Sequence, residues 1–330
     1  MSTPYEPPFT LTPRVVALVA GICEALGRLA GREGVQAPPA LRRGNRLRTI
    51  QASLAIENNS LTLEQVTAVI AGKRVLGAQK EIQEVRNAFA AYEAMESWKP
   101  WAAKDFLKAH QILMTGLVDR PGRYRTGGVG IAQGEKVVHL APPADRVTGL
   151  MNDLQGWLKR TDVHPLIASC VFHYEMEFIH PFADGNGRMG RLWQTLILSR
   201  WKPVLAYLPV ESVIRDRQSE YYQALAASDK QGQSTVFIEF LLSALLQALQ
   251  ETAWTDQVSD QVTDQVKALL KCLDKGPLTA LECLKKLGLS HRPTFRKNYL
   301  QPALQAGLVE MTLPDRPNSR FQKYRRVKGT

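Results

Sequence analysis

The spacing of hydrophobic and polar residues follows the helical period over most of the chain. Start signals mark several segments: Thr12 precedes Pro13 as a cap before a first-turn proline, and Thr62 with Gln65 forms a capping box. The pattern predicts helices over residues 11–31, 41–58, 61–73, 78–95, 103–117, 144–159, 165–179, 188–199 and, as a pair, 219–251.

One segment departs from this pattern, "TGGVGIAQGEKVVHLAPP" at residues 126–143. Two short β-prone runs flank Gln133-Gly134-Glu135 there, a combination that is typical of a β-hairpin. We therefore predict a mainly α-helical protein with one hairpin inserted between its helices.

The pattern changes again near Val262. Three helices and then two strands around a Pro-Asn-rich loop are predicted, over residues 262–274, 279–290, 292–310 and within 311–327. This is the element order of a winged helix-turn-helix, with Gly288 in the turn before the third helix. The polar repeat "DQVSDQVTDQV" precedes it, so we expect a linker at 252–261 and a separate domain at 262–330.

Composition narrows the class of protein. The chain has 330 residues with 45% hydrophobic and 22% charged residues, which is ordinary for a soluble globular protein of about two domains. The apolar run from Val15 to Cys23 ends at Glu24 and is too short to span a bilayer, and no leader sequence precedes it. The four cysteines lie far apart without CxxC spacing. We therefore expect reduced thiols, a cytoplasmic location and no membrane partner.

Charge is concentrated at the C-terminal end. The net charge is +11, and residues 291–330 hold nine Lys or Arg against two acids. This favours an acidic partner, with DNA as the first candidate, although a solvated basic tail is equally consistent. The candidate DNA-binding residues are Arg292, Arg296 and Lys297 on the third helix, and Arg320, Lys323, Arg325 and Arg326 at or beyond the wing.

The stretch "HPFADGNGRMGR", residues 180–191, concentrates candidate chemistry. Gly185, Asn186 and Gly187 are residue types that tolerate positive φ, so their N–H groups are expected to form a nest before a helix starting near Arg188. A nest followed by a helix N-terminus binds anionic oxygen.

The charged residues of the stretch fit the same ligand. Arg188 and Arg191 are three apart on the expected helix and could clamp two phosphates. Asp184 is placed to hold Mg²⁺ against those phosphates, and His180 could take a proton from an attacking hydroxyl as a general base.

The stretch also resembles, without departure, the signature loop of the Fic domain family (filamentation induced by cAMP), a resemblance that covers roughly residues 49–251. Family members transfer AMP from ATP to a Ser, Thr or Tyr hydroxyl of a target protein. The resemblance implies His180 as the base, Asp184 as the Mg²⁺ ligand, and ATP phosphates held by the N–H groups at 185–187 and by the two arginines. Relatives similar to the Doc toxin carry lysine in place of Gly187 and transfer phosphate, so glycine favours AMP transfer.

Two further segments fit the family. Residues 125–143 resemble its flap, a hairpin whose edge pairs with the backbone of the target. "SEYYQAL" resembles the segment beside the nucleotide base, so Tyr221 and Tyr222 are candidates for the ATP site. Two aromatics that pack a helix into the core are an equally good explanation of this pair.

"SLAIEN" matches the inhibitory-helix pattern [S/T]xxxE[G/N] of the family through Ser53, Glu57 and Asn58. Ser53 and Glu57 are four apart and share a helix face. If this helix packs beside the loop, the Glu57 carboxylate is the natural partner of Arg191 when ATP is absent. The expected organisation is an N-terminal helical segment at 1–48, a Fic core at 49–251 with the inhibitory helix at 49–58, the linker and the C-terminal domain.

The expected function is protein adenylylation with ATP and Mg²⁺, autoinhibited by Glu57. Three alternatives stay open at this point. The chain could be chiefly a DNA-binding regulator, its C-terminal domain could dock a protein, or it could remove AMP from proteins using Glu57. The target, the modified residue type and a homo-oligomeric state are likewise left open by the sequence.

Overall fold

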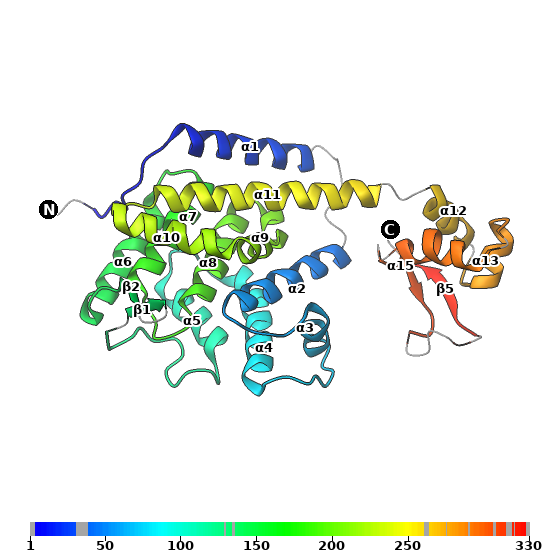
Figure 1. The fold of residues 1–330 in the computed structure, drawn as a ribbon, viewed down its shortest axis with the longest axis horizontal. Helices are drawn as coiled ribbons and strands as arrows, with labels where there is room; N and C mark the ends of the chain where they lie inside the picture. The colour runs from blue at the N-terminus through cyan, green and yellow to red at the C-terminus, as the bar shows by residue number, and fades with distance from the viewer. Residues whose placement is uncertain are drawn as a thin grey trace. The chain divides into compact units, whose positions relative to one another are not determined.

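A computed structural model of the chain (Figure 1) describes residues 4–30, 39–128, 130–133, 136–260, 264–274, 276–289, 291–305, 308–314, 319 and 321–327. They divide into two compact units. The first comprises Met1–Ala37 and Arg42–Gln250, and the second comprises Pro38–Leu41 and Glu251–Thr330. The chain is mainly helical, as predicted, and no helix of the described residues is long and apolar enough to cross a membrane.

Helices build most of the first unit. They are α1 (Pro13–Ala30), α2 (Pro39–Ile56), α3 (Leu63–Ile70), α4 (Gln79–Ala94), α5 (Ala103–Met114), α6 (Ala144–Arg160), α7 (Pro165–Ile179), α8 (Asn186–Trp201), α9 (Val210–Asp216), α10 (Gln218–Gln231) and α11 (Thr235–Asp260), with short 3₁₀ turns η1 (Met95–Ser97) and η2 (Pro203–Tyr207). The capping box that the sequence predicts at Thr62 and Gln65 is present at the start of α3.

The core of this unit lies around α7 and α8. Nearly every residue of α7 is buried, as expected for a helix that is apolar on most of its circumference. Trp193 of α8 is fully buried and donates its indole N–H to the carbonyl of Pro100 at 2.8 Å. The two helices and the loop between them are therefore held by surrounding elements. Helix α1 lies along α11 (Figure 1), and a Cβ at Gly21 would lie 3.4 Å from the side chain of Leu246.

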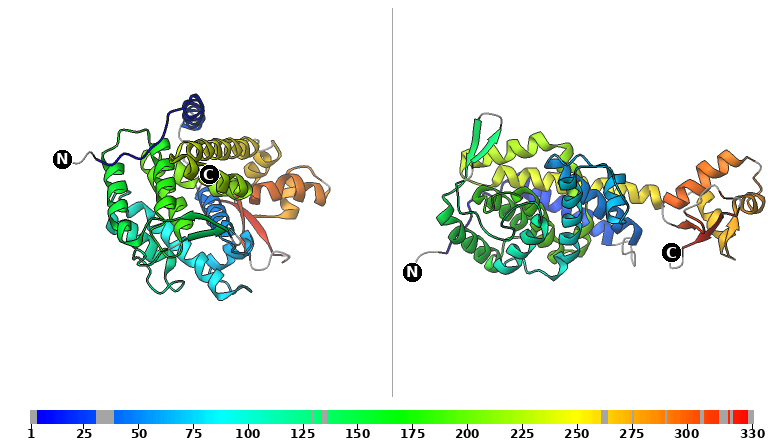
Figure 2. Two further views of the ribbon diagram at one scale, coloured as in Figure 1. Left: turned by 60° about the vertical axis from the view of Figure 1, so that its left-hand side comes forward. Right: turned by 90° about the horizontal axis from the view of Figure 1, so that it is seen from below.

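The predicted hairpin is present. Strands β1 (Gly130–Gln133) and β2 (Lys136–Leu140) pair antiparallel, with Gly130 opposite Leu140, and the register shifts between Ile131 and Ala132. In the right-hand view of Figure 2 the hairpin stands clear of the helices. Residues 134 and 135 at its turn lie outside the described residues.

The second unit combines helices with a small sheet. Its elements are α12 (Asp264–Leu273), β3 (Leu278–Thr279), α13 (Ala280–Lys286), α14 (Arg292–Phe295), η3 (Arg296–Leu300), α15 (Gln301–Gln305), β4 (Val309–Met311) and β5 (Lys323–Arg326). The antiparallel sheet has the order β3-β5-β4. A separate apolar core, with Leu269, Phe295 and Val309 nearly inaccessible, holds this unit together.

The third helix of this unit has an irregular turn. The segments α14, η3 and α15 follow one another without a break, and η3 is a π-helical turn. Pro302 lies in the next turn and has no N–H to donate to a helical hydrogen bond. The wider π-helical turn before it accommodates the missing bond.

Several element bounds differ from the sequence prediction. Helix α8 begins at Asn186, two residues before the expected Arg188. Neither α9 nor strand β3 is signalled by the sequence, because both are too short for periodicity to detect. The expected linker at 252–261 is helical as far as Asp260, and α11 simply continues through it.

Candidate active site

The loop between α7 and α8 carries the predicted motif, and His180 stands at its start. His180 is the C-cap of α7 and adopts a left-handed conformation with φ 49°, where the chain leaves the helix. Its Nδ1 lies 3.4 Å from the carbonyl oxygen of Glu177, one turn back along α7. This contact favours the tautomer with the proton on Nδ1, in which Nε2 is the basic nitrogen of the ring.

Arg125, which the sequence analysis missed, fastens the hairpin to this loop. Its buried guanidinium donates to the carbonyls of His180 at 2.7 Å and Gly127 at 2.8 Å. It also donates to the carbonyls of Pro142 at 2.5 Å and Ile179 at 3.3 Å. Because Gly127 and Pro142 flank the hairpin, one side chain fixes both of its ends relative to His180.

The anion-binding geometry differs from the predicted nest. Gly185 has φ 86° and is the N-cap of α8, but Asn186 and Gly187 are already helical and have negative φ. The N–H groups of Asn186, Gly187 and Arg188 therefore belong to the first helical turn, which precedes the first internal bond, from Met189 N–H to the Gly185 carbonyl at 3.0 Å. A helix N-terminus, rather than a nest, supplies the positive end.

Two residues brace this helix start. The side chain of Asn186 accepts from the N–H of Phe182 and donates to its carbonyl, both at 2.9 Å, so the amide closes the loop on itself. A Cβ at Gly185 would approach Met114 Sδ within 2.7 Å, so both the space and the positive φ require glycine there.

Asp184 lies directly before the helix start, with its carboxylate about half exposed. Its Oδ1 accepts from the N–H of Gly185 at 2.5 Å and from Nη2 of Arg188 at 3.1 Å. No group of three His, Cys, Asp or Glu side chains suited to a metal occurs in the described part of the chain. A single accessible carboxylate beside a helix N-terminus still fits Mg²⁺, which is held in nucleotide sites by one or two carboxylates and the phosphates.

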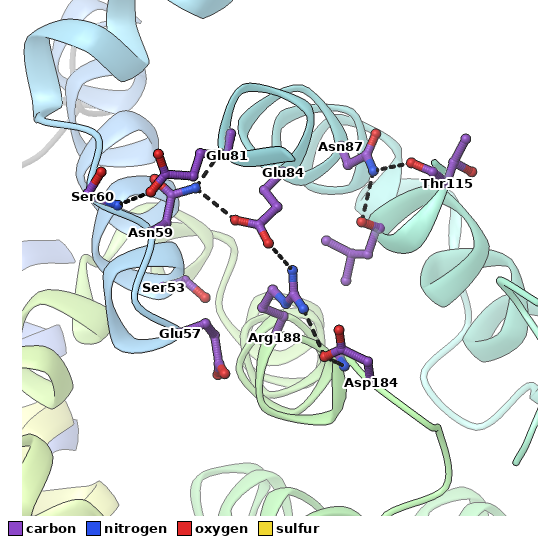
Figure 3. A network of polar contacts seen from close by, with 12 residues as sticks. Ser53, Glu57, Asn59, Ser60, Glu81, Glu84, Asn87, Thr115, Asp184 and Arg188 are labelled. Carbon is purple, nitrogen blue, oxygen red and sulfur yellow. Dashed lines mark hydrogen bonds and ion pairs between the residues drawn. The ribbon is translucent and has the colours of Figure 1, made fainter. Parts of the chain in front are cut away.

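The two motif arginines point to different partners. Arg188 is buried and lies between two carboxylates, with Nη1 3.2 Å from Oε1 of Glu84 and Nη2 on Asp184. Glu84, on α4, in turn accepts from the side chain of Asn59 at 2.8 Å through Oε2. Figure 3 shows this continuous chain of contacts from the end of the α2 segment to Asp184. The two arginines thus have different protein partners, and the clamp of both on two phosphates stays a prediction.

Arg191 is directed at α2. It is 1% exposed, and its Nη2 lies 2.7 Å from Oε1 of Glu57, as the sequence analysis expected for this pair. The same guanidinium donates to the hydroxyl of Ser53 at 2.9 Å and to its carbonyl at 3.0 Å. Burial lowers the pKa of Arg191, but the adjacent Glu57 carboxylate together with Tyr221 and Glu177 raises it, so the pKa stays above its ordinary value.

The backbone at the end of α2 explains why Asn58 belongs to the inhibitory-helix pattern [S/T]xxxE[G/N]. Asn58 has φ 66°, its N–H donates to the carbonyl of Ala55 at 3.0 Å, and the N–H of Asn59 donates to the carbonyl of Leu54 at 3.1 Å. This is the Schellman ending of a helix, with Glu57 as C-cap and a left-handed residue after it. Asparagine and glycine are the residue types that adopt this conformation at low cost, and the turn aims Glu57 at the loop.

Gly187 is required at the same contact. A Cβ at this position would overlap Oε1 of Glu57 and lie 3.1 Å from Nη1 of Arg191. Any side chain here would therefore displace Glu57 and would also fill space at the N-terminus of α8.

The two tyrosines lie in different environments. Tyr221 is 2% exposed, packs on Phe237, and its hydroxyl lies 3.2 Å from Nε2 of His173, so it is a core residue in this structure. Tyr222 is 43% exposed, and burial of the rest of its ring and the nearby Glu57 carboxylate raise its pKa. Of the pair, only Tyr222 offers surface to a ligand.

The basic candidates of the second unit are only partly available. Arg325 pairs with Glu310 at 2.5 Å and Arg326 with Asp274 at 2.7 Å, both within that unit. Arg292, Arg296, Lys297 and Lys323 are exposed, and Arg320 lies outside the described residues. The internal ion pairs offset two of the charges on which the sequence prediction of DNA binding relied.

Comparison with known proteins agrees with this geometry. A family model described as the Fic/DOC family matches residues 100–198, and one described as the C-terminal domain of "filamentation induced by cAMP protein Fic-like" matches residues 264–326. A "Protein adenylyltransferase Fic" from Nematostella vectensis is 29% identical over 204 residues, 58% of this chain and 45% of that protein. The relative of that name from Drosophila mojavensis is 28% identical over 233 residues, 66% of this chain and 44% of that protein. The chain thus spans less than half the length of these curated relatives.

Solved structures extend the match to the whole chain. Fic-1 from C. elegans, 23% identical with a TM-score of 0.59, shares the fold over 74% of this chain and 72% of its own. A crystal structure of a Fic family protein from Desulfovibrio desulfuricans G20 is 61% identical, has a TM-score of 0.74, and is matched over 99% of both chains. Because that likeness covers nearly every residue of both proteins, this chain belongs to the Fic family.

Proposed function

We propose that the protein transfers AMP from ATP to a Ser, Thr or Tyr hydroxyl of a target protein, and that Glu57 holds this activity low at rest. The observation that carries the proposal is the order of groups around the N-terminus of α8. A histidine whose Nε2 is the basic nitrogen in the favoured tautomer, a half-exposed carboxylate and the first-turn N–H groups of α8 lie along one short loop. The adenylyltransferase relatives support the same reaction.

His180 acts as the general base in this proposal. The incoming hydroxyl must lose its proton as its oxygen attacks the α-phosphorus, and Nε2 of His180 accepts that proton. Arg125 holds the carbonyl of His180 while it holds both ends of the hairpin. A target strand that pairs with the hairpin would therefore reach the base in a fixed geometry.

The phosphates are bound by the start of α8. The N–H groups of residues 186–188 and the helix dipole attract phosphate oxygens, and Arg191 supplies a cation once Glu57 has left it. Asp184 would hold Mg²⁺, which when bound neutralises charge on the phosphates. Arg188 keeps Asp184 in position through Oδ1, and the structure gives the other carboxylate oxygen no hydrogen-bond donor among the described residues.

Glu57 lowers this activity by occupying Arg191. Its carboxylate lies on the guanidinium and against Gly187, so it puts negative charge where the γ-phosphate needs a cation. ATP then binds only in a shifted pose, with the α-phosphate turned away from the hydroxyl. A charge-assisted contact of about 1.5–3 kcal/mol corresponds to roughly ten- to a hundredfold in transfer rate.

Separate labels on ATP test the reaction class. In a cell lysate, α-labelled ATP should pass its label to protein and γ-labelled ATP should not, and His180→Ala should abolish the transfer. Transfer of the γ-label would instead identify a kinase-like reaction. Loss of α-label from a protein that was adenylylated beforehand would identify the removal of AMP.

A second function is proposed for the C-terminal unit, which we interpret as a winged helix that binds DNA. The order of its helices and three-stranded sheet and the exposed Arg292, Arg296 and Lys297 support this proposal. Binding of the full chain to random duplex DNA should weaken steeply with salt, and each neutralised contact should flatten the log–log slope by about one unit. If the chain has no measurable affinity at low salt, the unit docks protein instead.

A further inference from the structure

His110 lies outside the motif but contacts its loop. It projects from α5 and is 2% exposed. Its Nε2 lies 3.0 Å from the carbonyl oxygen of Asp184, and its Nδ1 lies 2.9 Å from the N–H of Gly122. Met114, four residues further along the same helix face, is the residue against which Gly185 packs. One face of α5 thus supports the loop at two consecutive residues.

The partners of His110 fix its proton. The backbone N–H of Gly122 can only donate, so Nδ1 must accept, and the carbonyl of Asp184 can only accept, so Nε2 must carry the hydrogen. Both ring nitrogens are therefore used in one neutral tautomer, and neither is available to a substrate. This arrangement excludes a direct acid–base role and indicates a structural one.

The ring itself contacts the motif a second time. It stacks on Phe182 with centroids 3.6 Å apart and planes within 5°. The backbone of Phe182 is in turn held at the start of α8 by two hydrogen bonds with the side chain of Asn186. The imidazole thus contacts the loop twice, at Phe182 through its ring face and at the carbonyl of Asp184 through Nε2.

We propose that His110 is a positioning residue that sets the place of the Asp184 carboxylate for Mg²⁺, and this inference rests on the proposed function. Mg²⁺ demands close to ideal octahedral geometry, so a small displacement of a carboxylate ligand weakens binding. The side chain of Asp184 starts one bond from the carbonyl that His110 holds. Partners behind a metal ligand commonly change metal affinity ten- to a hundredfold when they are removed.

Substitutions that keep one hydrogen bond at a time test this role. In a Glu57→Gly background, His110→Gln places an amide N–H near the position of Nε2 and keeps the bond to Asp184. His110→Asn places an amide oxygen near Nδ1 and keeps only the bond to Gly122. His110→Phe keeps the stacking on Phe182 and loses both bonds.

The measurement is Mn²⁺ affinity, from electron paramagnetic resonance of free Mn²⁺, for protein saturated with α,β-methylene ATP. Thermal unfolding of each variant reports folding separately. We expect His110→Asn and His110→Phe to weaken Mn²⁺ binding about tenfold or more, and His110→Gln to stay within about threefold. If His110→Phe does not fold, the Asn and Gln pair decides the question.

Asp184→Ala separates this inference from the proposed function. If Asp184→Ala weakens Mn²⁺ binding while His110→Asn binds as tightly as the parent, or as tightly as His110→Gln, the positioning role is overturned and the metal ligand stands. If Asp184→Ala binds Mn²⁺ as tightly as the parent, Asp184 is not a ligand and both proposals about the metal fail.

Discussion

Oε1 of Glu57 lies 2.7 Å from Nη2 of Arg191, although 134 residues separate the two in sequence. Arg191 is buried and also donates to the hydroxyl and carbonyl of Ser53, so the end of α2 holds the guanidinium at three points. The N-terminal turns of α8 and the last turn of α2 are therefore parts of one contact. A substitution in one of these two segments is therefore expected to alter the position of the other.

Asn58 should control how firmly Glu57 is held. Asn58→Ala places a residue that disfavours positive φ at the left-handed position, whereas Asn58→Gly does not. We expect Asn58→Ala to lower stability by about 1 kcal/mol and to raise self-labelling from α-labelled ATP several-fold, with Asn58→Gly close to wild type on both. A less stable Asn58→Ala protein with unchanged labelling would show that the helix ending does not position Glu57.

His180→Ala should separate binding from turnover. In the proposed mechanism the base acts on a proton in the transition state, while phosphate contacts come from α8 and Arg191. In the Glu57→Gly background, we expect loss of transfer with ATP affinity, measured by calorimetry, within about threefold. An equally severe loss of ATP affinity would mean that His180 also supports the nucleotide.

Glu84 should matter for stability far more than its neighbour Glu81. Glu84 is buried against Arg188, so its removal leaves a buried cation with one carboxylate fewer. Glu81 is only partly buried and accepts from the N–H of Ser60 at 2.6 Å. In urea unfolding we expect a loss of about 3–5 kcal/mol for Glu84→Ala and a much smaller loss for Glu81→Ala. Equal losses would show that the Arg188 pair contributes nothing beyond packing.

Glu175 should make stability fall as the pH rises. Burial raises its pKa to about 7; the hydrogen bond from the Tyr5 hydroxyl acts in the opposite direction, and the charge of Asp229 adds to the rise. Asp229 also accepts a hydrogen bond from the Tyr174 hydroxyl at 2.9 Å. The protonated carboxyl is favoured by folding, so this stabilisation is complete below about pH 4.5 and is lost as the pH passes through about 7.

The matched variant for this effect is Glu175→Gln, which stays neutral at every pH. The wild-type protein should lose on the order of 3 kcal/mol of unfolding free energy between about pH 5 and pH 8 relative to this variant. Denaturant titrations at a series of pH values measure the difference. Parallel pH profiles would mean that Glu175 titrates normally.

The sequence predicted the fold where its signals are local and periodic. The long helices, the capping box at Thr62 and the hairpin around Gln133 carry such signals, and all are present. The start of α8 was placed two residues late because two glycines suggested an irregular nest. The helix instead begins at once, since Gly185 alone makes the turn and the Asn186 side chain closes it.

The candidate site was predictable only as far as its motifs extend. The contact of Glu57 with Arg191 follows from two recognisable patterns whose residues meet. Arg125, Glu84 and His110 act through backbone carbonyls or through another side chain, and such contacts leave no spacing to read in a single sequence. The orientation of Arg188 toward Glu84 was missed for the same reason, because its partner lies on a helix 104 residues away.

The most direct test of the account compares wild-type protein with Glu57→Gly for transfer of label from α-labelled ATP to protein, with γ-labelled ATP and the Glu57→Gly, His180→Ala double variant as controls. We predict that Glu57→Gly raises α-labelling about ten- to a hundredfold, that Ser53→Ala gives a smaller rise, and that the double variant and the γ-label give none. Labelling by Glu57→Gly at or below the wild-type level would contradict autoinhibition and leave Glu57 either a structural partner of Arg191 or a residue needed to remove AMP.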